Sequence, residues 1–207
     1  MIKNPIFSII LAALLIVPAL AQDNSKNANI DNYIQQLKHN DNSKVKIMAI
    51  QALTSSNDPR ATDSLIQALA YKDNNIRIEA VGALGRRDDP RAINPLIQAL
   101  GDDDSDVHAA AIEALTEIGA PAIDPLIQAL QDGNSLIRKG AAVALGEIGD
   151  SKAKKPLLQV LSNDEDRNVQ LSAARALKKI GEEGHSFAIV KNSIIWGGGF
   201  QLPDEED

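Results

Sequence analysis

The chain has 207 residues, of which 44% are hydrophobic, and this supplies enough apolar material for one ordinary domain with a core. Its formal net charge of −7 excludes the basic surface typical of DNA- and RNA-binding proteins, so we expect no nucleic-acid partner. The chain has no cysteine, which excludes disulfides, thiolate nucleophiles and cysteine-based metal sites.

The N-terminus has the pattern of a secretory signal peptide. Lys3 supplies a positive start, residues 6–17 form an apolar run, and Ala19-Leu20-Ala21 has the small-x-small form of a cleavage site. The run is shorter than the ~20 residues that a membrane-spanning helix needs. We therefore predict that residues 1–21 direct export to the periplasm or the extracellular space and leave no membrane span after cleavage. The alternative is an uncleaved N-terminal anchor.

Residues 22–29 are polar and predict a flexible spacer.

From residue 30 to residue 183, one pattern recurs five times. The block Leu65-Ile66-Gln67-Ala68-Leu69 returns at Leu96 and Leu126, with looser copies that begin at Tyr33 and Leu157. The first residues of the five copies lie 32, 31, 30 and 31 positions apart. A fixed period in this range is typical of a stacked array in which each repeat contacts its neighbours.

Each copy predicts two amphipathic helices. In the third copy, apolar residues at 93, 96, 97 and 100 have the spacing of one helix face, and the same spacing returns over residues 107–118. The second helix carries one small residue at the same place in every copy, where two helix backbones can approach closely: Ala49, Ala80, Ala111, Ala141 and Ala173. Acidic turns between the helices favour N-caps.

Glycine and proline mark the helix ends. Gly119, Gly149 and Gly181 follow the second helices, where a left-handed residue is expected. Prolines at positions 95, 125 and 156 fall shortly after the start of the first helices. These helices therefore either begin in two stages or are kinked at the proline.

The segment DPRAINPLIQALGDDDSDVHAAAIEALTEIG resembles a short HEAT-like repeat of the phycobilisome-lyase type. The turn, the Val-x-x-x-Ala-x-x-Ala-Leu core and the closing Ile-Gly carry the resemblance, which covers about three quarters of the chain. It implies an all-α fold: an α-solenoid of about five HEAT-like helix pairs in a right-handed superhelical stack. The second helices would line the concave side.

Enzymes share this repeat class, but the residues do not favour an enzyme. Deoxyhypusine hydroxylases, which resemble this fold, bind two irons through paired His-Glu motifs, whereas His39, His108 and His185 are each followed by another residue type. No diagnostic motif of the phycobilin lyases carries over, and export would place the protein outside the cytosol in which they act. We predict no catalytic residue and no cofactor. An enzyme or cofactor-handling protein related to these families is the alternative.

His108 has a structural interpretation. It stands where Lys46, Arg77 and Arg138 stand in sister repeats. That position predicts a side chain that pairs with the turn acids of a neighbouring repeat.

The third acidic turn looks like a calcium loop. Asp102, Asp104, Asp106 and Glu113 occupy positions 1, 3, 5 and 12 of an EF-hand. Position 6 should be glycine but is Val107, which the repeat pattern puts on a helix. We interpret these residues as a solvated turn and predict no metal site, with weak calcium binding at the acidic turns left open.

The predicted binding surface lies on the second helices. Residues outside the buried stripe would form a mixed apolar and polar groove, shallow at Ala110 and Gly140, which fits a protein or peptide partner. Ile47, Ile78 and Leu171 have the alternative of packing against the next repeat. The candidate partner-binding residues are Met48, Gln51, Glu79, Gly82, Ala110, Glu113, Gly140, Val143, Ser172 and Arg175.

Residues 184–207 depart from the repeat. Phe187, Val190 and Ile194 have helical spacing and predict a C-terminal cap on the last repeat, followed by an acidic tail. Alternatively, Trp196 and Phe200 would anchor an exposed docking tail. The sequence thus predicts an exported, non-catalytic scaffold, with self-association through the end cap as a further alternative.

Overall fold

The computed structural model describes residues 29–87, 89–181, 186–190 and 193–197. The predicted signal peptide, the spacer up to residue 28 and Phe200 lie outside the described residues, and of Trp196 only the backbone is described.

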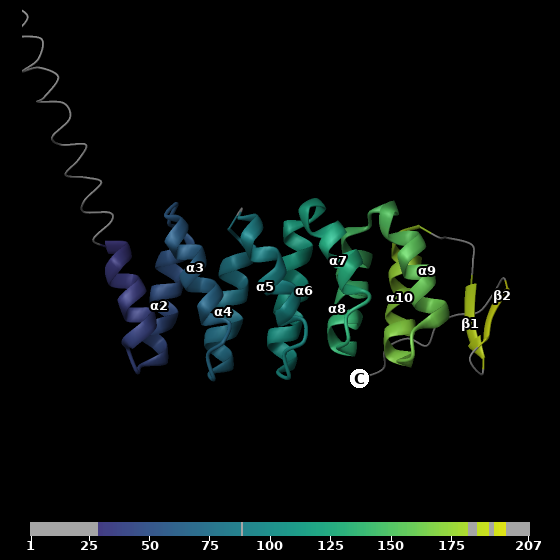
Figure 1. The fold of residues 1–207 in the computed structure, drawn as a ribbon, viewed down its shortest axis with the longest axis horizontal. Helices are drawn as coiled ribbons and strands as arrows, with labels where there is room; N and C mark the ends of the chain where they lie inside the picture. The colour runs from purple at the N-terminus through teal and green to yellow at the C-terminus, as the bar shows by residue number, and fades with distance from the viewer. Residues whose placement is uncertain (1–28, 88, 182–185, 191–192, 198–207) are drawn as a thin grey trace, which may run out of the picture.

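The described residues form five helix pairs, which confirms the predicted solenoid (Figure 1). A first helix over residues 29–39 precedes α2 (Ser43–Thr54). The other pairs are α3 (Pro59–Ala68) with α4 (Asn74–Gly85), α5 (Ile93–Ala99) with α6 (Ser105–Ile118), α7 (Ile123–Ala129) with α8 (Ser135–Ile148), and α9 (Lys154–Asn163) with α10 (Arg167–Lys179).

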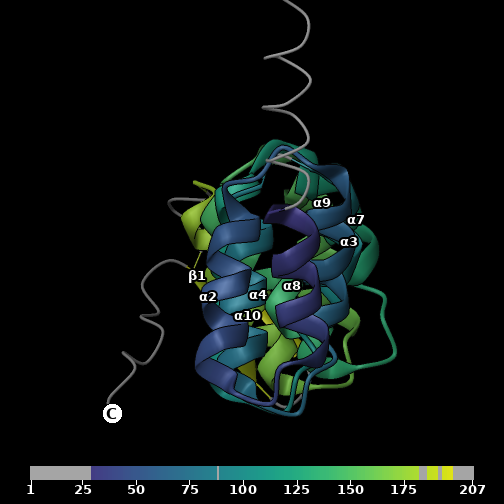
Figure 2. The same cartoon turned by 90° about the vertical axis from the view of Figure 1, so that its left-hand side faces the viewer.

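The helices form two layers. Figure 2, which looks along the array, shows the second helices of the pairs on one side and the first helices on the other. We call α2, α4, α6, α8 and α10 the even layer, and the first helix with α3, α5, α7 and α9 the odd layer. Consecutive even helices contact each other, and α4, α6, α8 and α10 each contact their own odd partner, so the apolar stripes of both layers face a shared interior.

Short 3-10 turns settle how the odd helices begin. The turns η1 (Pro90–Ala92), η2 (Ala120–Ala122) and η3 (Ser151–Ala153) lead directly into α5, α7 and α9. The later prolines therefore sit in the first turn of each α-helix, where a missing N–H costs no hydrogen bond. These helices start in two stages, and the three glycines predicted to end even helices have positive φ angles of 69° to 87°.

Leucine and alanine fill the core. The alanine that recurs in every even helix is at most 2% exposed in each repeat. Ile47 and Ile78 are half-buried and pack against this core. No helix among the described residues is long and apolar enough to cross a membrane.

Cationic side chains join neighbouring repeats at the turns, as predicted for this position. Arg77 Nε and Nη2 donate to Asp102 in the next repeat at 2.8 and 2.9 Å. Arg138 makes the same forked contact with Asp164 at 2.9 and 3.0 Å. Two members of this position depart from the prediction: His108 Nδ1 contacts the Leu100 carbonyl oxygen of its own repeat, and Lys46 lies over the Tyr71 ring of the next repeat.

A half-buried arginine that the sequence did not single out joins the first two repeats. Arg87 donates to the carbonyl oxygens of Leu53, Ser56 and Asp58 and to the Thr62 hydroxyl, at 2.6 to 3.2 Å. Burial lowers the pKa of the Arg87 guanidinium. The pattern could not reveal this role, because the equivalent positions elsewhere are not arginine.

The helical spacing predicted after residue 184 is wrong. The strands β1 (Ser186–Val190) and β2 (Ser193–Gly197) pair antiparallel, with Phe187 opposite Trp196. Both segments are rich in β-branched and aromatic residues, which favour strands, and apolar runs this short satisfy both periods. Figure 1 shows the hairpin beyond α9, at the end of the array.

Candidate partner-binding face

The predicted partner-binding residues all lie on even helices, but not all reach the surface. Met48 is 67% exposed, and Gln51, Glu113 and Arg175 are also exposed. The half-buried members are Glu79, Gly82, Ala110 and Val143. These eight residues lie on the outer face of the even layer, which we call the even face.

Gly140 and Ser172 do not belong to this face, which corrects the predicted set. Ser172 is 5% exposed, and Gly140 is also buried. A β-carbon on Gly140 would lie 2.8 Å from a methyl carbon of Leu100 and 3.2 Å from the His108 ring. The missing side chain at Gly140 therefore makes room for the neighbouring repeat and does not open a groove.

A cavity of about 210 Å³ lies between α4 and α6 on the even face. It brings together four predicted residues, Glu79, Gly82, Ala110 and Glu113. We call it the α4–α6 groove, and its lining is Ile78, Glu79, Gly82, Arg86, Ala110, Glu113, Ala114 and Glu117.

Sequence reasoning missed two charged residues of this groove. Glu117 follows Glu113 by one helical turn, and Arg86 follows Gly82 by the same interval. Residues four apart share a helix face, so the spacing could have revealed both. They were missed because the repeats were compared only over the first seven residues that begin at the first Val or Ile of each second helix. Arg86 and Glu117 lie further along their helices.

Three carboxylates and one guanidinium set the charge of the groove. Glu79 Oε1 accepts a hydrogen bond from Gln51 Nε2 of α2 at 3.2 Å. Among the described residues, Glu113 and Glu117 have no side-chain partner, and Arg86 makes no ion pair. Arg86 lies beside Gly82, because a β-carbon there would be 3.3 Å from its Nη1.

Charge is distributed unevenly along the even face. In α6 the exposed charged residues are acidic: Asp106, Glu113 and Glu117. In α10 the exposed charged residues are basic: Arg167, Arg175, Lys178 and Lys179. Lys179 forms an ion pair with Glu147 of α8. The face is therefore acidic at its centre and basic at its C-terminal end.

Another cavity lies elsewhere, between α7 and α9. It measures about 730 Å³, and its lining includes Gln131, Gln159, Arg138 and Asp164. The Arg138 and Asp164 side chains are only 9% and 6% exposed, and the hydrogen bonds that Arg138 donates to the Asp164 carboxylate raise the pKa of the guanidinium. Because these charges satisfy each other, we interpret the cavity as the gap above a structural ion pair.

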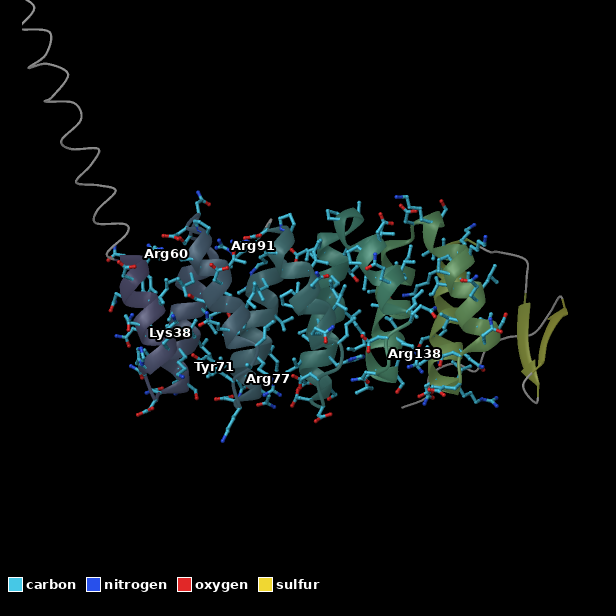
Figure 3. All side chains as sticks on the ribbon, in the orientation of Figure 1. Lys38, Arg60, Tyr71, Arg77, Arg91 and Arg138 are labelled. Carbon is cyan, nitrogen blue, oxygen red and sulfur yellow. The ribbon has the colours of Figure 1, made fainter. Side chains whose placement is uncertain are left out.

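The opposite, odd layer carries its own ion pairs between repeats, and these differ from the buried pairs. Figure 3 shows Arg60 and Arg91 at the upper edge of the array and Arg77 and Arg138 at the lower edge. The exposed pairs are Arg60–Asp31 at 2.6 Å, Arg91–Asp63 at 2.7 Å and Lys152–Asp124 at 4.0 Å. Exposed pairs of this kind add little stability each.

The acids of the calcium-like turn have structural partners. Asp102 binds Arg77, while Asp104 caps α6 by accepting from the backbone N–H groups of Asp106 and Val107. Glu113 lies on α6, away from the turn. Within the described ranges, no three His, Asp or Glu side chains are grouped so that they could hold a metal ion.

The comparisons with known proteins agree with the helical array. The HEAT-repeat family model matches residues 30–116 and 93–178, which together make up more than half of the chain. No curated protein is similar to the chain. The MAST/Orbit N-terminal domain is 18% identical over 72% of this chain and 81% of that one, with a TM-score of 0.57, and shows the fold alone.

Two solved structures have the functions that the resemblance raised as alternatives. The complex of CpcE and CpcF of phycocyanin lyase from Nostoc sp. PCC7120 is 25% identical over 74% of this chain and 65% of that one, with a TM-score of 0.49. Human deoxyhypusine hydroxylase is 21% identical over 72% and 73%, with a TM-score of 0.35.

Proposed function

Because the chain belongs to the HEAT-repeat family, we propose that it is a non-catalytic scaffold that binds a protein or peptide partner on its even face. The α4–α6 groove is the observation that carries this proposal. Its lining includes Glu79, Gly82, Ala110 and Glu113, and carboxylates without a partner in the described part of the chain border it. A groove between two helices is a common site for an extended or helical segment of another protein.

A pull-down from the producing cell tests the proposal. The bait is the immobilised protein, and the test variant is Glu79→Lys/Glu113→Lys/Arg175→Glu. The matched control, Gln98→Lys/Gln128→Lys, changes the net charge equally at exposed residues of the odd layer. We expect one partner to be retained by the unaltered protein and the control and lost by the test variant. Equal retention by all three would exclude the even face.

We further propose that the scaffold works outside the cytoplasm, because the N-terminus has the pattern of a signal peptide. Mass spectrometry of the protein from envelope and secreted fractions tests this. A mature N-terminus at Gln22 is the expected result. Retention of Met1 in a membrane fraction would support the uncleaved anchor.

The competing class is an enzyme or cofactor-handling protein. A chromophore or a stoichiometric metal that copurifies with the protein would support that class and contradict the non-catalytic scaffold. Absorption spectra and elemental analysis of protein purified from its own cell distinguish the two.

A further inference from the structure

We propose that the α4–α6 groove receives a lysine or arginine side chain of the partner, presented beside an apolar residue on the same segment. This inference rests on the proposed scaffold function and names the chemistry that the groove recognises. Its basis is the combination of an uncharged floor, an acidic rim and a neighbouring apolar side chain.

The floor of the groove suits a long aliphatic stem. Gly82, Ala110 and Ala114 line it with no side-chain atoms beyond Cβ, and Ile78 adds further apolar surface. Lysine and arginine bury their methylene groups on such surface while the charged head stays near water or a carboxylate. The cavity of about 210 Å³ gives such a stem a place to lie between the two helices.

The rim of the groove suits the charged head. Glu79, Glu113 and Glu117 approach from α4 and α6, and the described residues offer Glu113 and Glu117 no ion pair. With Arg86 as its one lining cation, the groove has a formal charge of −2. Complementary charge selects partners and speeds their association, so a cationic segment is favoured over an acidic one.

An apolar side chain lies next to the rim. Met48 of α2 has the highest exposure of the large hydrophobic residues in the described part of the chain. It lies one turn before Gln51, whose amide donates to Glu79 at the groove. Exposed methionine is common on surfaces that adapt to a partner. The segment that fits therefore carries an apolar residue near its cation.

Replacement of Arg86 tests the proposal, because the proposal predicts that it increases the affinity for the partner. Its guanidinium lies beside Gly82 within the groove, where a cation from the partner would otherwise be placed. Since Arg86 repels and obstructs a second cation, Arg86→Gln should strengthen binding. If Arg86 only supported the structure of the groove, its replacement would weaken binding.

The experiment uses fluorescence anisotropy with two labelled probe peptides. Both have about 12 residues with leucine on one helical face, and they differ only in carrying lysine or glutamate at the remaining positions. The purified protein should bind the lysine probe and not the glutamate probe. Glu113→Lys/Glu117→Lys should weaken binding at least about tenfold, and Arg86→Gln should strengthen it about threefold.

A matched control separates the groove from general attraction. Asp41→Lys/Asp103→Lys changes the net charge equally at exposed turn residues, so it should leave the affinity within about twofold. Equal weakening by both double variants, or binding of the glutamate probe, would overturn the proposal. If a charge-reversed variant loses its helical circular dichroism, the exposed Glu117→Gln serves instead, with about threefold weakening expected and no change contradicting the proposal.

Failure here is distinguishable from failure of the scaffold function. If the even face captures its partner but neither the lysine probe nor that partner responds to the groove variants, the scaffold stands and the cationic recognition is wrong. If the lysine probe binds as expected but capture of the partner is unchanged by the even-face substitutions, the scaffold proposal fails.

Discussion

Gly146 of α8 lies so close to Ala176 of α10 that a β-carbon on Gly146 would stand 2.7 Å from the Ala176 Cα. Gly85 of α4 has the same relationship to Ala114 of α6. The equivalent residue of α2 and α6 is threonine, whose hydroxyl donates to the carbonyl oxygen four residues earlier. Glycine therefore permits close backbone approach at two of the four interfaces between even helices.

We predict that Gly146→Ala destabilises the protein, although alanine favours helices over glycine. The added methyl group would overlap α10, and overpacking of this kind costs about 1–3 kcal/mol. Urea denaturation followed by circular dichroism measures the change. Gly133→Ala is the control, because a β-carbon there would meet nothing within 4 Å. Equal stability of the two variants would contradict the close approach.

Arg138→Met should destabilise the protein by about 3 kcal/mol. The substitution leaves the Asp164 carboxylate, which is 6% exposed, without its guanidinium partner. The control Lys152→Met breaks an exposed pair of 4.0 Å and should cost less than about 1 kcal/mol. The same denaturation experiment compares them, and similar losses would show that burial does not matter at Arg138.

Asp89 should contribute a pH-dependent part of the stability. Hydrogen bonding from Arg91 lowers the pKa of the Asp89 carboxyl below its ordinary value of 3.8. A lowered folded-state pKa stabilises the protein above the unfolded-state pKa, and the contribution disappears as the pH falls through the folded-state value. Asp89→Asn should therefore be less stable by about 1 kcal/mol or less at neutral pH, since Arg91 is 47% exposed.

The pH at which the two proteins are compared decides this prediction. Below about pH 4, the gap in stability between the unaltered protein and Asp89→Asn should begin to narrow, because the Asp89 carboxyl is then protonated in the unfolded chain, and it should close as the pH falls through the lower folded-state pKa. Thermal melts from pH 7 to pH 2 provide the measurement. A gap that stays constant or widens in acid would show that the charge of Asp89 is not responsible.

Gly82→Leu should block partner binding without weakening the fold. A β-carbon there meets only the flexible end of Arg86, so the side chain can enter the α4–α6 groove at no cost to the core. Leucine also favours helices over glycine by up to about 1 kcal/mol. We expect at least about tenfold weaker partner capture in the pull-down, together with equal or higher stability. Unchanged capture would place the partner away from the groove.

The helical array could be predicted because its signals repeat. Each copy carries a helix-spaced stripe and a polar turn, and the last three copies also carry a closing glycine, so an ambiguity in one copy is resolved by the others. The start of α5 stayed open because Pro95 fits both a kink and a two-stage start. The hairpin was missed because residues 186–197 occur once, and their short apolar runs match helix and strand alike.

The candidate site was predictable in position but less so in composition. The repeat pattern placed Glu79 and Glu113 on one face, where the structure finds the α4–α6 groove. A glycine, however, fits an open groove and a close helix contact equally well. Gly82 opens to the surface, whereas the neighbouring repeat fills the space at Gly140. Only three-dimensional packing distinguishes them.

The most direct test of the scaffold function is site-specific photo-crosslinking in the producing cell. A benzophenone amino acid replaces Met48, Glu113 or Arg175 on the even face, or Gln67, Gln98 or Gln128 on the odd layer, all of which are exposed. The account predicts one crosslinked partner, identified by mass spectrometry, from the even-face positions alone. Crosslinks that arise mainly from the glutamine positions, or from none of the six, would contradict it.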